Sequence, residues 1–440
     1  MKPKKVKEYN FLIIPIFFIF LIFIEVNVVN DYLNIEKWKY FIWQGENRGL
    51  NAIIVWNAVS LVFISLYFYK SIYYERYIAP LVSLLLFSIL IVSPFIFGDK
   101  VKNLLANSAT FKNEGVLYLD FTTNVLSAKC IYDSSSESYC KNYNSLIFPY
   151  GNTAIIFKFV PSQFIEFIAL ILNISTLVIL VYVVVKSLGI SSAPIFLSSP
   201  WVYFALERAN ADLYLLIILL LGSYFPMKKY QVLYWVSYFY MVTLKPIYAG
   251  YLLSTKISIK NIIILILGII FILGSYNFSL ESLSSNRAKV NPTPFGSLGF
   301  TDAIELVDII FQNNNITAYF LIFIFVILFI LYIDKNKPLS IAALEGNGDF
   351  VSRNMFLILV IIVVGNQVNY KLILLIPLLI IALNKSNTNV LATTILGLIT
   401  IGQHTIIRNI FTLVLAILII KYLIDDFRYR INNRVKVDLN

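Results

Sequence analysis

The sequence predicts an all-α polytopic membrane protein, and composition and apolar patterning are the two observations that predict it. Of the 440 residues, 59% are hydrophobic and only 13% are charged, with a mean hydropathy of +0.79. A chain of this composition has too few polar residues for a water-soluble surface. Apolar runs that approach the length of a bilayer crossing recur along the whole chain. We therefore expect a multi-pass protein of the cell membrane.

Charge is distributed as in a membrane protein. The formal net charge of +11 comes mostly from Lys and Arg clustered in short segments. Such clustering is typical of cytoplasmic loops and differs from the basic surface of a nucleic-acid-binding protein, so nucleic acid is excluded as a partner. The basic start at residues 1–7 leads into an apolar run over residues 10–29, which we expect to stay as an anchor rather than be cleaved as a signal peptide.

About twelve apolar segments approach spanning length. They cover residues 10–29, 51–69, 78–97, 163–185, 190–206, 212–226, 261–279, 316–333, 354–368, 371–384, 389–403 and 409–424. The basic residues between them favour a topology in which both termini are cytoplasmic. Residues 98–151 and 280–315 then form two longer extracytoplasmic loops, and loops of such length are more often functional than idle.

Residues 230–255 do not fit a simple span. Pro246 removes a backbone donor in mid-run, and Lys245 would lie far from either membrane surface in a straight helix. A single span would place residues 334–353 and the C-terminus outside. A re-entrant or broken pair of short helices, entering and leaving by the same face, keeps these basic segments inside. We favour the broken pair.

The two long loops carry further features. Cys130 and Cys140 lie in the first, where an oxidising compartment favours a disulfide between them. The second contains an amphipathic run at residues 301–311, which either lies on the membrane surface or is a plain connecting helix.

A charged stretch at residues 204–218 is the strongest candidate for a functional site. Glu207, Arg208, Asn210 and Asp212 stand between two apolar runs. Ionisable groups beside hydrocarbon are costly and usually mark a site or a pathway. The alternative is a solvated turn in which Arg208 and Asp212 form an i,i+4 ion pair. In the favoured topology, further polar residues reach the same external face: Asp120, Lys245, Asn366, Asn369, Lys371, His404 and Arg408.

Four short elements, in order along the chain, resemble a known family. They are Leu119-Asp120-Phe121 with the later Phe148-Pro149-Tyr150-Gly151, the stretch from Phe204 to Asp212, Lys245-Pro246-Ile247-Tyr248, and Asn369-Tyr370-Lys371-Leu372-Ile373. Together they resemble glycosyltransferase family 87, a group of polyprenol-phosphate-sugar-dependent enzymes of the C fold that includes mannosyltransferases of phosphatidylinositol mannoside synthesis. Ala209 stands where the family commonly has glycine.

The resemblance implies a domain organisation and a reaction. Residues 1–77 would be a two-span addition, residues 78–425 the catalytic bundle, and residues 426–440 a basic cytoplasmic tail. The implied reaction is transfer of a sugar from a polyprenyl-phosphate donor to a lipid or glycan acceptor at the extracytoplasmic face, with inversion. No nucleotide-binding fingerprint or phosphate loop is present, which agrees with a lipid-borne donor.

The resemblance also implies roles for individual residues. Asp120 is the candidate general base; otherwise it is a loop acid paired with Lys129 or water. Arg208 is the best phosphate ligand because its guanidinium offers a charged fork to two oxygens. Weaker candidates for substrate binding are Lys245, Tyr370, Lys371, His404 and Arg408. Some of these side chains have an ordinary explanation, because a lysine can snorkel to the membrane interface and a histidine can be hydrogen-bonded at a helix end.

The remaining polar residues would contact the sugar or the acceptor. Glu207 and Asp212 would accept hydrogen bonds from hydroxyl groups, with Asn210 beside them. We expect no cofactor and no required metal, because no spacing of His or Asp among the outer residues is typical of a metal site.

Two other classes stay open. A secondary transporter or lipid flippase would also use a broken helix with charge inside the membrane, as around Lys245. A polymerase or ligase of surface polysaccharide would share the compartment and the lipid-linked donor. A transporter site is expected near the bilayer centre, whereas a transferase site is expected at the outer face.

Overall fold

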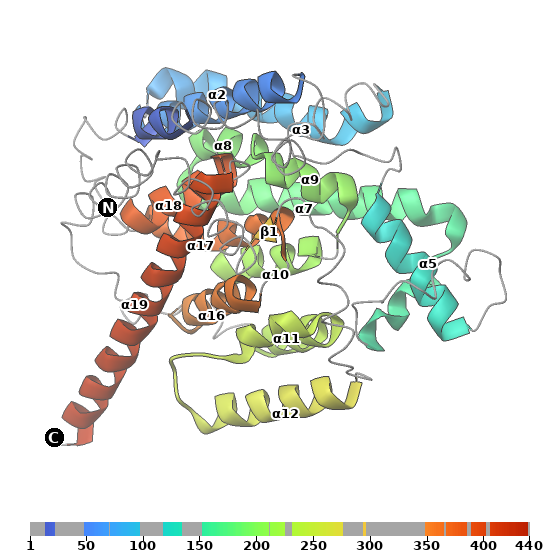
Figure 1. Ribbon diagram of the computed structural model, residues 1–440, viewed down its shortest axis with the longest axis vertical. Coiled ribbons are helices and arrows are strands. Elements are labelled where there is room, and N and C mark those ends of the chain that lie inside the picture. Colours follow the sequence, from blue (N-terminus) through green and yellow to red (C-terminus); the bar gives the residue numbers. More distant parts are fainter. Residues whose placement is uncertain are drawn as a thin grey trace, which may run out of the picture.

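The chain forms a helical bundle in the computed structural model (Figure 1). The structure describes residues 14–22, 48–69, 71–96, 118–133, 152–210, 212–224, 231–275, 294–295, 348–364, 367–384, 389–401 and 405–438. Within these ranges the only sheet is a pair of two-residue antiparallel strands, β1 (Pro294–Phe295) and β2 (Gln367–Val368).

The first half of the chain supplies one side of the bundle. Its α-helices are α2 (Arg48–Tyr69), α3 (Ala79–Ile96), α5 (Leu119–Asp133), α7 (Ile165–Leu188), α8 (Ala193–Leu197), α9 (Pro200–Arg208) and α10 (Asp212–Tyr224). A π-helical turn, η2 (Tyr74–Ile78), leads into α3, and the 3₁₀ turns η3 (Asn152–Phe159), η4 (Ser162–Phe164) and η5 (Ile190–Ser192) flank α7. The helices α2, α3 and α7 match predicted spans.

The second half completes the bundle. It contains α11 (Gln231–Leu244), the 3₁₀ helix η6 (Pro246–Leu252), α12 (Ile259–Ser275), α16 (Gly348–Val364), the 3₁₀ helix η8 (Asn369–Leu375), α17 (Ile376–Asn384), α18 (Asn389–Ile401) and α19 (Thr405–Asp438). The 34-residue α19 extends away from the bundle towards the C-terminus (Figure 1). Of the predicted spans, 316–333 lies outside the described residues.

Two sequence predictions, a helix break near Pro246 and an unbroken apolar segment over residues 190–206, have different outcomes. The break near Pro246 is confirmed, because α11 ends at Leu244 and Lys245 is extended, with φ −137° and ψ 113°. The single apolar helix predicted for residues 190–206 is wrong: the segment is divided into η5, α8 and α9. Ser199 is extended before Pro200, which cannot donate a backbone hydrogen bond to the preceding turn.

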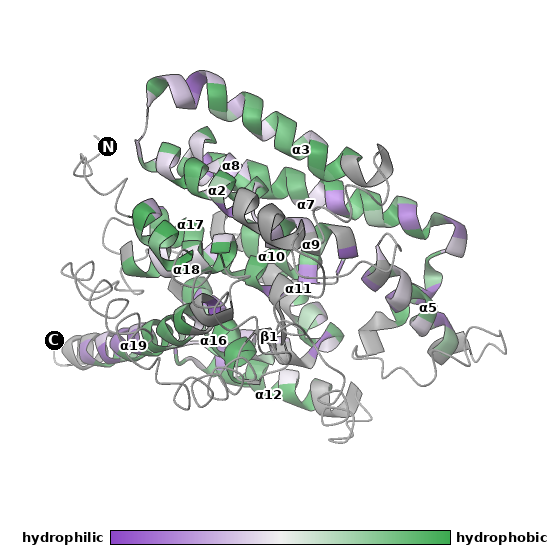
Figure 2. Cartoon of the chain, turned by 45° about the horizontal axis from the view of Figure 1, so that its top comes forward, coloured by the Kyte–Doolittle hydropathy of each residue, from purple (hydrophilic) through white to green (hydrophobic). Residues whose placement is uncertain are grey.

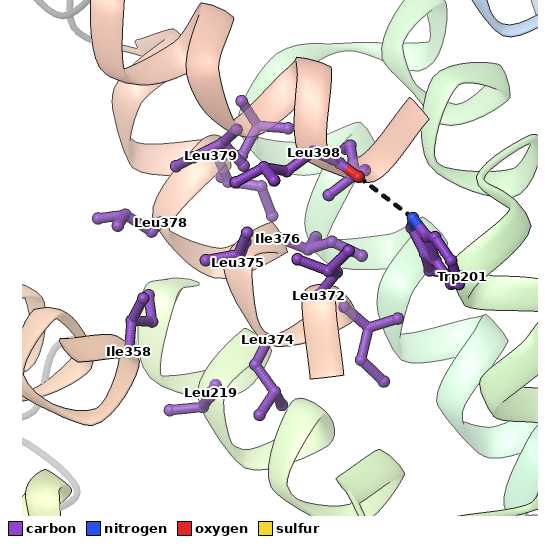
Figure 3. Close-up of a cluster of buried hydrophobic side chains, with 14 of the residues drawn as sticks. Trp201, Leu219, Ile358, Leu372, Leu374, Leu375, Ile376, Leu378, Leu379 and Leu398 are labelled. Atoms are coloured by element: carbon purple, nitrogen blue, oxygen red, sulfur yellow. Dashed lines mark hydrogen bonds between the residues drawn. The ribbon is translucent and has the colours of Figure 1, made fainter. Parts of the chain in front are cut away.

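The main hydrophobic core joins helices from both halves of the chain. Figure 3 shows Trp201 of α9 beside leucine and isoleucine side chains of η8, α17 and α18. The indole Nε1 of Trp201 donates to the carbonyl oxygen of Leu398 at 3.1 Å. The Ser199 hydroxyl donates to the carbonyl oxygen of Ile399 at 2.9 Å. These bonds fix α9 against α18, so the C-terminal end of α9 has a defined position.

A second, smaller core lies under α5, at the edge of the bundle (Figure 1). The helix packs against η3 and α7. The buried members of this core are Tyr118, Phe121, Val125, Ala128, Phe157, Ile165, Ala169, Ala209 and Leu244. Because Ala209 and Leu244 belong to this core, the ends of α9 and α11 meet the start of α5 there.

Hydrophobic residues predominate along most of the helices (Figure 2), and many large apolar side chains are exposed. Two helical stretches, Tyr74–Val92 and Ser162–Leu188, are long and apolar enough to cross a membrane. Shorter apolar helices are Asn57–Tyr69, Ile259–Phe271, Lys371–Asn384 and Val390–Ile401. The structure therefore has a helical bundle with two candidate spans, and the larger number of spans stays a prediction.

Candidate functional site

The turn between α9 and α10 brings Arg208, Asn210 and Asp212 to one place. Ala209 adopts a left-handed conformation, with φ 46° and ψ 48°, and caps α9. Its N–H donates to the carbonyl oxygen of Leu206 at 3.1 Å, and the N–H of Asn210 donates to that of Ala205 at 3.3 Å. Arg208 is therefore the last residue of one helix and Asp212 the first of the next.

The carboxylate of Asp120 meets this turn from the first turn of α5. Its Oδ1 lies 3.4 Å from Nη1 of Arg208. Its Oδ2 accepts a hydrogen bond of 2.5 Å from Nδ2 of Asn210. The predicted alternative for Asp120, a pair with Lys129, is not formed, because Lys129 Nζ donates to the hydroxyl of Ser162 at 2.8 Å.

A second ion pair lies directly beside the first. Lys245, at the break between α11 and η6, places Nζ 3.1 Å from Oδ1 of Asp212. The alternative i,i+4 pair between Arg208 and Asp212 is therefore replaced by two pairs that join distant segments. The Asp212 side chain is fully buried, so it is better placed to hold Lys245 than to contact a sugar as predicted.

Asn210 connects the two ion pairs. Besides donating to Asp120, its side chain accepts through Oδ1 from the backbone N–H of Asp212 at 2.9 Å. Nζ of Lys245 reaches the same oxygen at 3.5 Å. The amide orientation is fixed, because only the nitrogen can donate to a carboxylate and only the oxygen can accept from an N–H.

The backbone is strained on both sides of the Asp120 contact. Tyr118 and Ala209 are the non-glycine residues with positive φ in the described part of the chain, at 56° and 46°. Tyr118 lies two residues before Asp120, and Ala209 lies between Arg208 and Asn210. Left-handed L-residues are costly and persist only where packing holds them, often at functional sites. Both residues are buried in the second core.

Electrostatics act on Asp120 in opposing directions. Burial raises the pKa of its carboxyl above the ordinary value, and the charge of Asp212 adds to this. Arg208, the hydrogen bond from Asn210, and Lys245 lower the pKa, but burial has the largest effect. With 23% of the side chain exposed, this acid is both accessible and less acidic than a free aspartate. These are properties of a general base.

Lys371 adds a third cation near the pairs. It is buried in η8, which packs against α9 and α10, and its charge interacts with those of Asp212 and Lys245. The structure thus brings together six residues selected from the sequence: Asp120, Arg208, Asn210, Asp212, Lys245 and Lys371.

The other predicted site residues are placed differently or not described. Arg408 is buried in the first turns of α19, which packs against α18 and α16. Glu207 lies in α9 and Tyr370 in η8, but the structure does not describe their side chains. His404 and Asn366 lie outside the described residues.

The sequence did not identify two supports of the site. The left-handed Tyr118 had no signal in the sequence, whereas Ala209 had one, since it stands where the resembling family commonly has glycine. Asn173 of α7 was also missed: its Nδ2 donates to the carbonyl oxygen of Leu206 at 2.6 Å and so ties the last turn of α9 to α7.

One cysteine lies in the described part of the chain. Cys130, near the end of α5, is disulfide-bonded. Cys140, the partner that the sequence predicts, lies outside the described residues. In the parts that the structure describes, no group of three or more His, Cys, Asp or Glu side chains could hold a metal ion.

Comparison with known proteins adds no assignment. No family model, no curated protein and no solved structure matches the chain. Any function must therefore be argued from the residues of the cluster and from the bundle that holds them.

Proposed function

We propose that the protein is a multi-pass membrane glycosyltransferase that takes a sugar from a polyprenyl-phosphate donor and transfers it to a lipid or glycan acceptor. The observation that carries the proposal is the accessible Asp120 carboxylate beside Arg208, at a meeting point of helix ends in an apolar bundle. An acid and a cation so close offer a base for an attacking hydroxyl and a ligand for a departing phosphate.

The outer surface supports the membrane part of the proposal. Large apolar side chains are exposed on helices far apart in the chain, whereas soluble proteins rarely expose large apolar patches. On α3, α7, α12 and α19 the most exposed include Leu81, Leu84, Leu85, Phe167, Val178, Ile263, Ile270 and Ile417. Lipid is the solvent that such a surface fits. We place both termini on the cytoplasmic side and the Asp120 cluster on the extracytoplasmic side, as the Lys and Arg distribution favours.

The charge of the cluster supports a donor with one phosphate. Counted by residue type among the described side chains of the cluster, the bases Arg208, Lys245 and Lys371 outnumber the acids Asp120 and Asp212 by one, which leaves a formal charge of +1. A sugar phosphodiester of a polyprenol carries one negative charge and would balance it. The side chains thus offer charge compensation of their own for the leaving group.

The proposed reaction uses each group once. The Asp120 carboxylate accepts the proton of the acceptor hydroxyl while the hydroxyl oxygen attacks the anomeric carbon. The bond from that carbon to the phosphate oxygen breaks, and polyprenyl phosphate leaves with the bonding electrons. Arg208 stabilises the developing charge, with Lys245 and Lys371 behind it. Attack from the face opposite the phosphate inverts the anomeric centre.

The test is incubation of membranes containing the protein with radiolabelled polyprenyl-phosphate sugars. We expect one of them to be consumed, with the label appearing in a new lipid or glycan product. The Asp120→Asn variant, expressed to the same level, should leave the donor intact. Failure of the unaltered protein to use any lipid-phosphate sugar, over a panel of hexoses and pentoses, would refute the proposal.

A transporter or lipid flippase is the second candidate, and the broken segment at Lys245 favours it. Lys245 and Asp212 are buried and ion-paired beside a helix break, as in transporters that bind substrates at discontinuous helices. Reconstitution distinguishes the two functions. A flippase would move a labelled lipid between leaflets without changing it, whereas the transferase would change the donor chemically.

A further inference from the structure

We propose that Asn210 is a positioning residue: its amide orients the Asp120 carboxylate and ties it to the Lys245–Asp212 pair, instead of contacting a substrate. The inference rests on the proposed function for its catalytic meaning, because Asp120 is the base only if the protein transfers sugars. The contacts themselves do not depend on that function.

The oxygen of the amide and one of its two N–H groups are engaged by the protein. Nδ2 donates to Oδ2 of Asp120 at 2.5 Å. Oδ1 accepts from the N–H of Asp212 at 2.9 Å and lies 3.5 Å from Nζ of Lys245. Asn210 is 2% exposed, and its backbone carbonyl accepts from the N–H of Leu213 at 2.9 Å. A residue held in this way is suited to hold a neighbour and poorly suited to reach a sugar.

The position of the amide follows from the fold. Ala209 reverses the chain after α9, so Asn210 begins the cap of α10 while Arg208 still belongs to α9. Both Asn210 and Arg208 then reach the same carboxylate, one at each oxygen. Two donors on two oxygens fix the plane of a carboxylate, whereas one donor would leave it free to rotate. The Asp120 lone pairs that stay available therefore point in a defined direction.

A single atom change tests this role. Asn210→Asp keeps the Oδ1 oxygen, which accepts from the N–H of Asp212 and faces Lys245. It replaces the NH2 group that donates to Asp120 by a second carboxylate oxygen. Two carboxylates at hydrogen-bond distance cannot both ionise easily, so Asp120 should hold its proton to higher pH. The matched control is Asn261→Asp, since Asn261 faces Arg353, in a different charged cluster.

The other charged groups around α5 stay the same in this comparison. Arg208 belongs to α9, Asp212 to α10 and Lys245 to the break before η6, and all three act on Asp120. On the elements packed against α5, Glu166 of α7 acts on Tyr118, and Lys158 of η3 lies over the ring of Phe159. Asn210→Asp replaces none of these residues, and of them Lys245 is the one that its new carboxylate also faces.

The readout is pH-dependent labelling of Asp120 by a carbodiimide with a glycine ester, quantified by peptide mass spectrometry on the full chain in detergent. Carbodiimides react with the protonated carboxyl. We expect the midpoint of Asp120 labelling to rise by about one pH unit or more in Asn210→Asp and to stay unchanged in Asn261→Asp. An unchanged midpoint in Asn210→Asp, or an equal rise in both variants, overturns the proposal.

A second variant keeps the test decisive if Asn210→Asp fails to insert or fold. Asn210→Ser retains an oxygen that can cap Asp212 but is too short to reach Asp120. With a lipid-phosphate sugar as substrate, it should lower kcat more than tenfold with KM changed less than threefold. A rise in KM with kcat preserved would show instead that Asn210 binds substrate. If no such sugar is consumed, the proposed function fails, but the labelling midpoints still decide whether Asn210 positions Asp120.

Discussion

Two buried charged clusters flank η6, and they differ in how tightly the cation is held. At one end, Arg208 and Lys245 pair with Asp120 and Asp212. At the other, Arg353 of α16 pairs with Asp349 at 3.0 Å. Asp120 and Asp349 are equally exposed, at 23%, so exposure of the acid does not separate the clusters.

The surroundings of the guanidinium separate them. Nη1 of Arg353 donates to the carbonyl oxygens of Tyr251 and Leu252 at 3.2 and 3.0 Å, and Nη2 donates to Oδ1 of Asn261 at 2.6 Å. Its guanidinium carbon lies 4.7 Å from the ring centre of Trp235. The side chain is fully buried, whereas that of Arg208 is 15% exposed and 3.4 Å from its acid. A guanidinium that donates from every nitrogen, as that of Arg353 does, stabilises the fold. A partly exposed guanidinium that lies 3.4 Å from its carboxylate, as that of Arg208 does, can exchange this partner for a ligand.

The cluster of Arg353 and Asp349 extends to α19. Asp349 also accepts a hydrogen bond from Ser254. The backbone N–H of Thr255 donates to the Ser352 hydroxyl at 2.8 Å, and the Thr255 hydroxyl donates to Asp426. Asp426 is in turn paired with Arg430 at 2.8 Å. The turn after η6 is therefore clamped between α16 and α19, which leaves the other end of η6, at Lys245, as the end where ligand binding is expected.

The largest effect expected from the comparison is on turnover. Asp120→Asn keeps the shape of the side chain and removes the proton acceptor, so transfer should fall by about 100- to 10,000-fold with donor affinity little changed. Asp349→Asn makes the same change in an equally exposed, Arg-paired acid. It should lower the melting temperature and leave the turnover of the folded protein within about threefold. Equal losses of turnover in both variants would remove the distinction between the clusters.

The next effect is on the free energy of unfolding, which should fall more at the Arg353 cluster than at the Asp120 cluster. Arg353→Ala removes the donor to two backbone carbonyls and to Asn261 and leaves Asp349 with Ser254 but no cation, and breaking a buried pair costs about 3–5 kcal/mol. Arg208→Ala should cost only about 1 kcal/mol, since its pair is long and partly exposed. It should instead weaken donor binding together with turnover. Thermal unfolding in detergent and donor titration would measure the two effects, and a greater destabilisation by Arg208→Ala would contradict this assignment.

The sequence predicted the Lys245 end of η6 better than the Arg353 end. The apolar runs are interrupted by polar residues at 207–212 and by Lys245 before Pro246. The sequence therefore predicts both the position of the charged cluster and the helix break at Pro246. The pairing of Arg208 with Asp120 could not, because 88 residues separate them and no local pattern encodes such a contact. For residues 334–353, which include Arg353, the sequence predicts only a basic cytoplasmic segment, because the positive-inside bias explains basic residues without any contact.

Helix assignments failed where a window of hydropathy conceals a break. Residues 190–206 are apolar on average, but Ser199 and Pro200 divide them. Likewise, residues 371–384 begin as the 3₁₀ helix η8 and only then become α17. The left-handed backbone at Tyr118 could not be predicted from the sequence either, because an aromatic residue does not favour positive φ.

A smaller effect concerns pH and Asp120, which lies in the predicted external loop. Because burial raises its folded-state pKa above the ordinary value of 3.8, the ionised acid is disfavoured in the folded protein. Its contribution to stability is fully present below the unfolded-state pKa and is lost as pH rises through the folded-state pKa. Relative to Asp120→Asn, the unaltered protein should therefore become more stable as pH falls from 7 towards 4. Melting temperatures of the two proteins over this range would show it, and a difference that grows in the opposite direction would mean that Arg208 and Asn210 outweigh burial.

The smallest effect concerns Ala209, the left-handed residue in the turn between Arg208 and Asn210. Ala209→Gly removes a methyl group from a backbone with φ 46°, where an L-residue is disfavoured by about 1–2 kcal/mol. Glycine gains more freedom in the unfolded chain, which offsets about 0.4–1 kcal/mol of the relief. The variant should therefore be as stable as the unaltered protein or more stable by up to about 1.6 kcal/mol. Ala205→Gly, one turn earlier inside α9, should instead lose about 1 kcal/mol or more, because glycine weakens a helix interior. Destabilisation of equal size at both positions would show that Ala209 carries no strain, and the turn would then owe its shape to Asn210 and the packing of the second core alone.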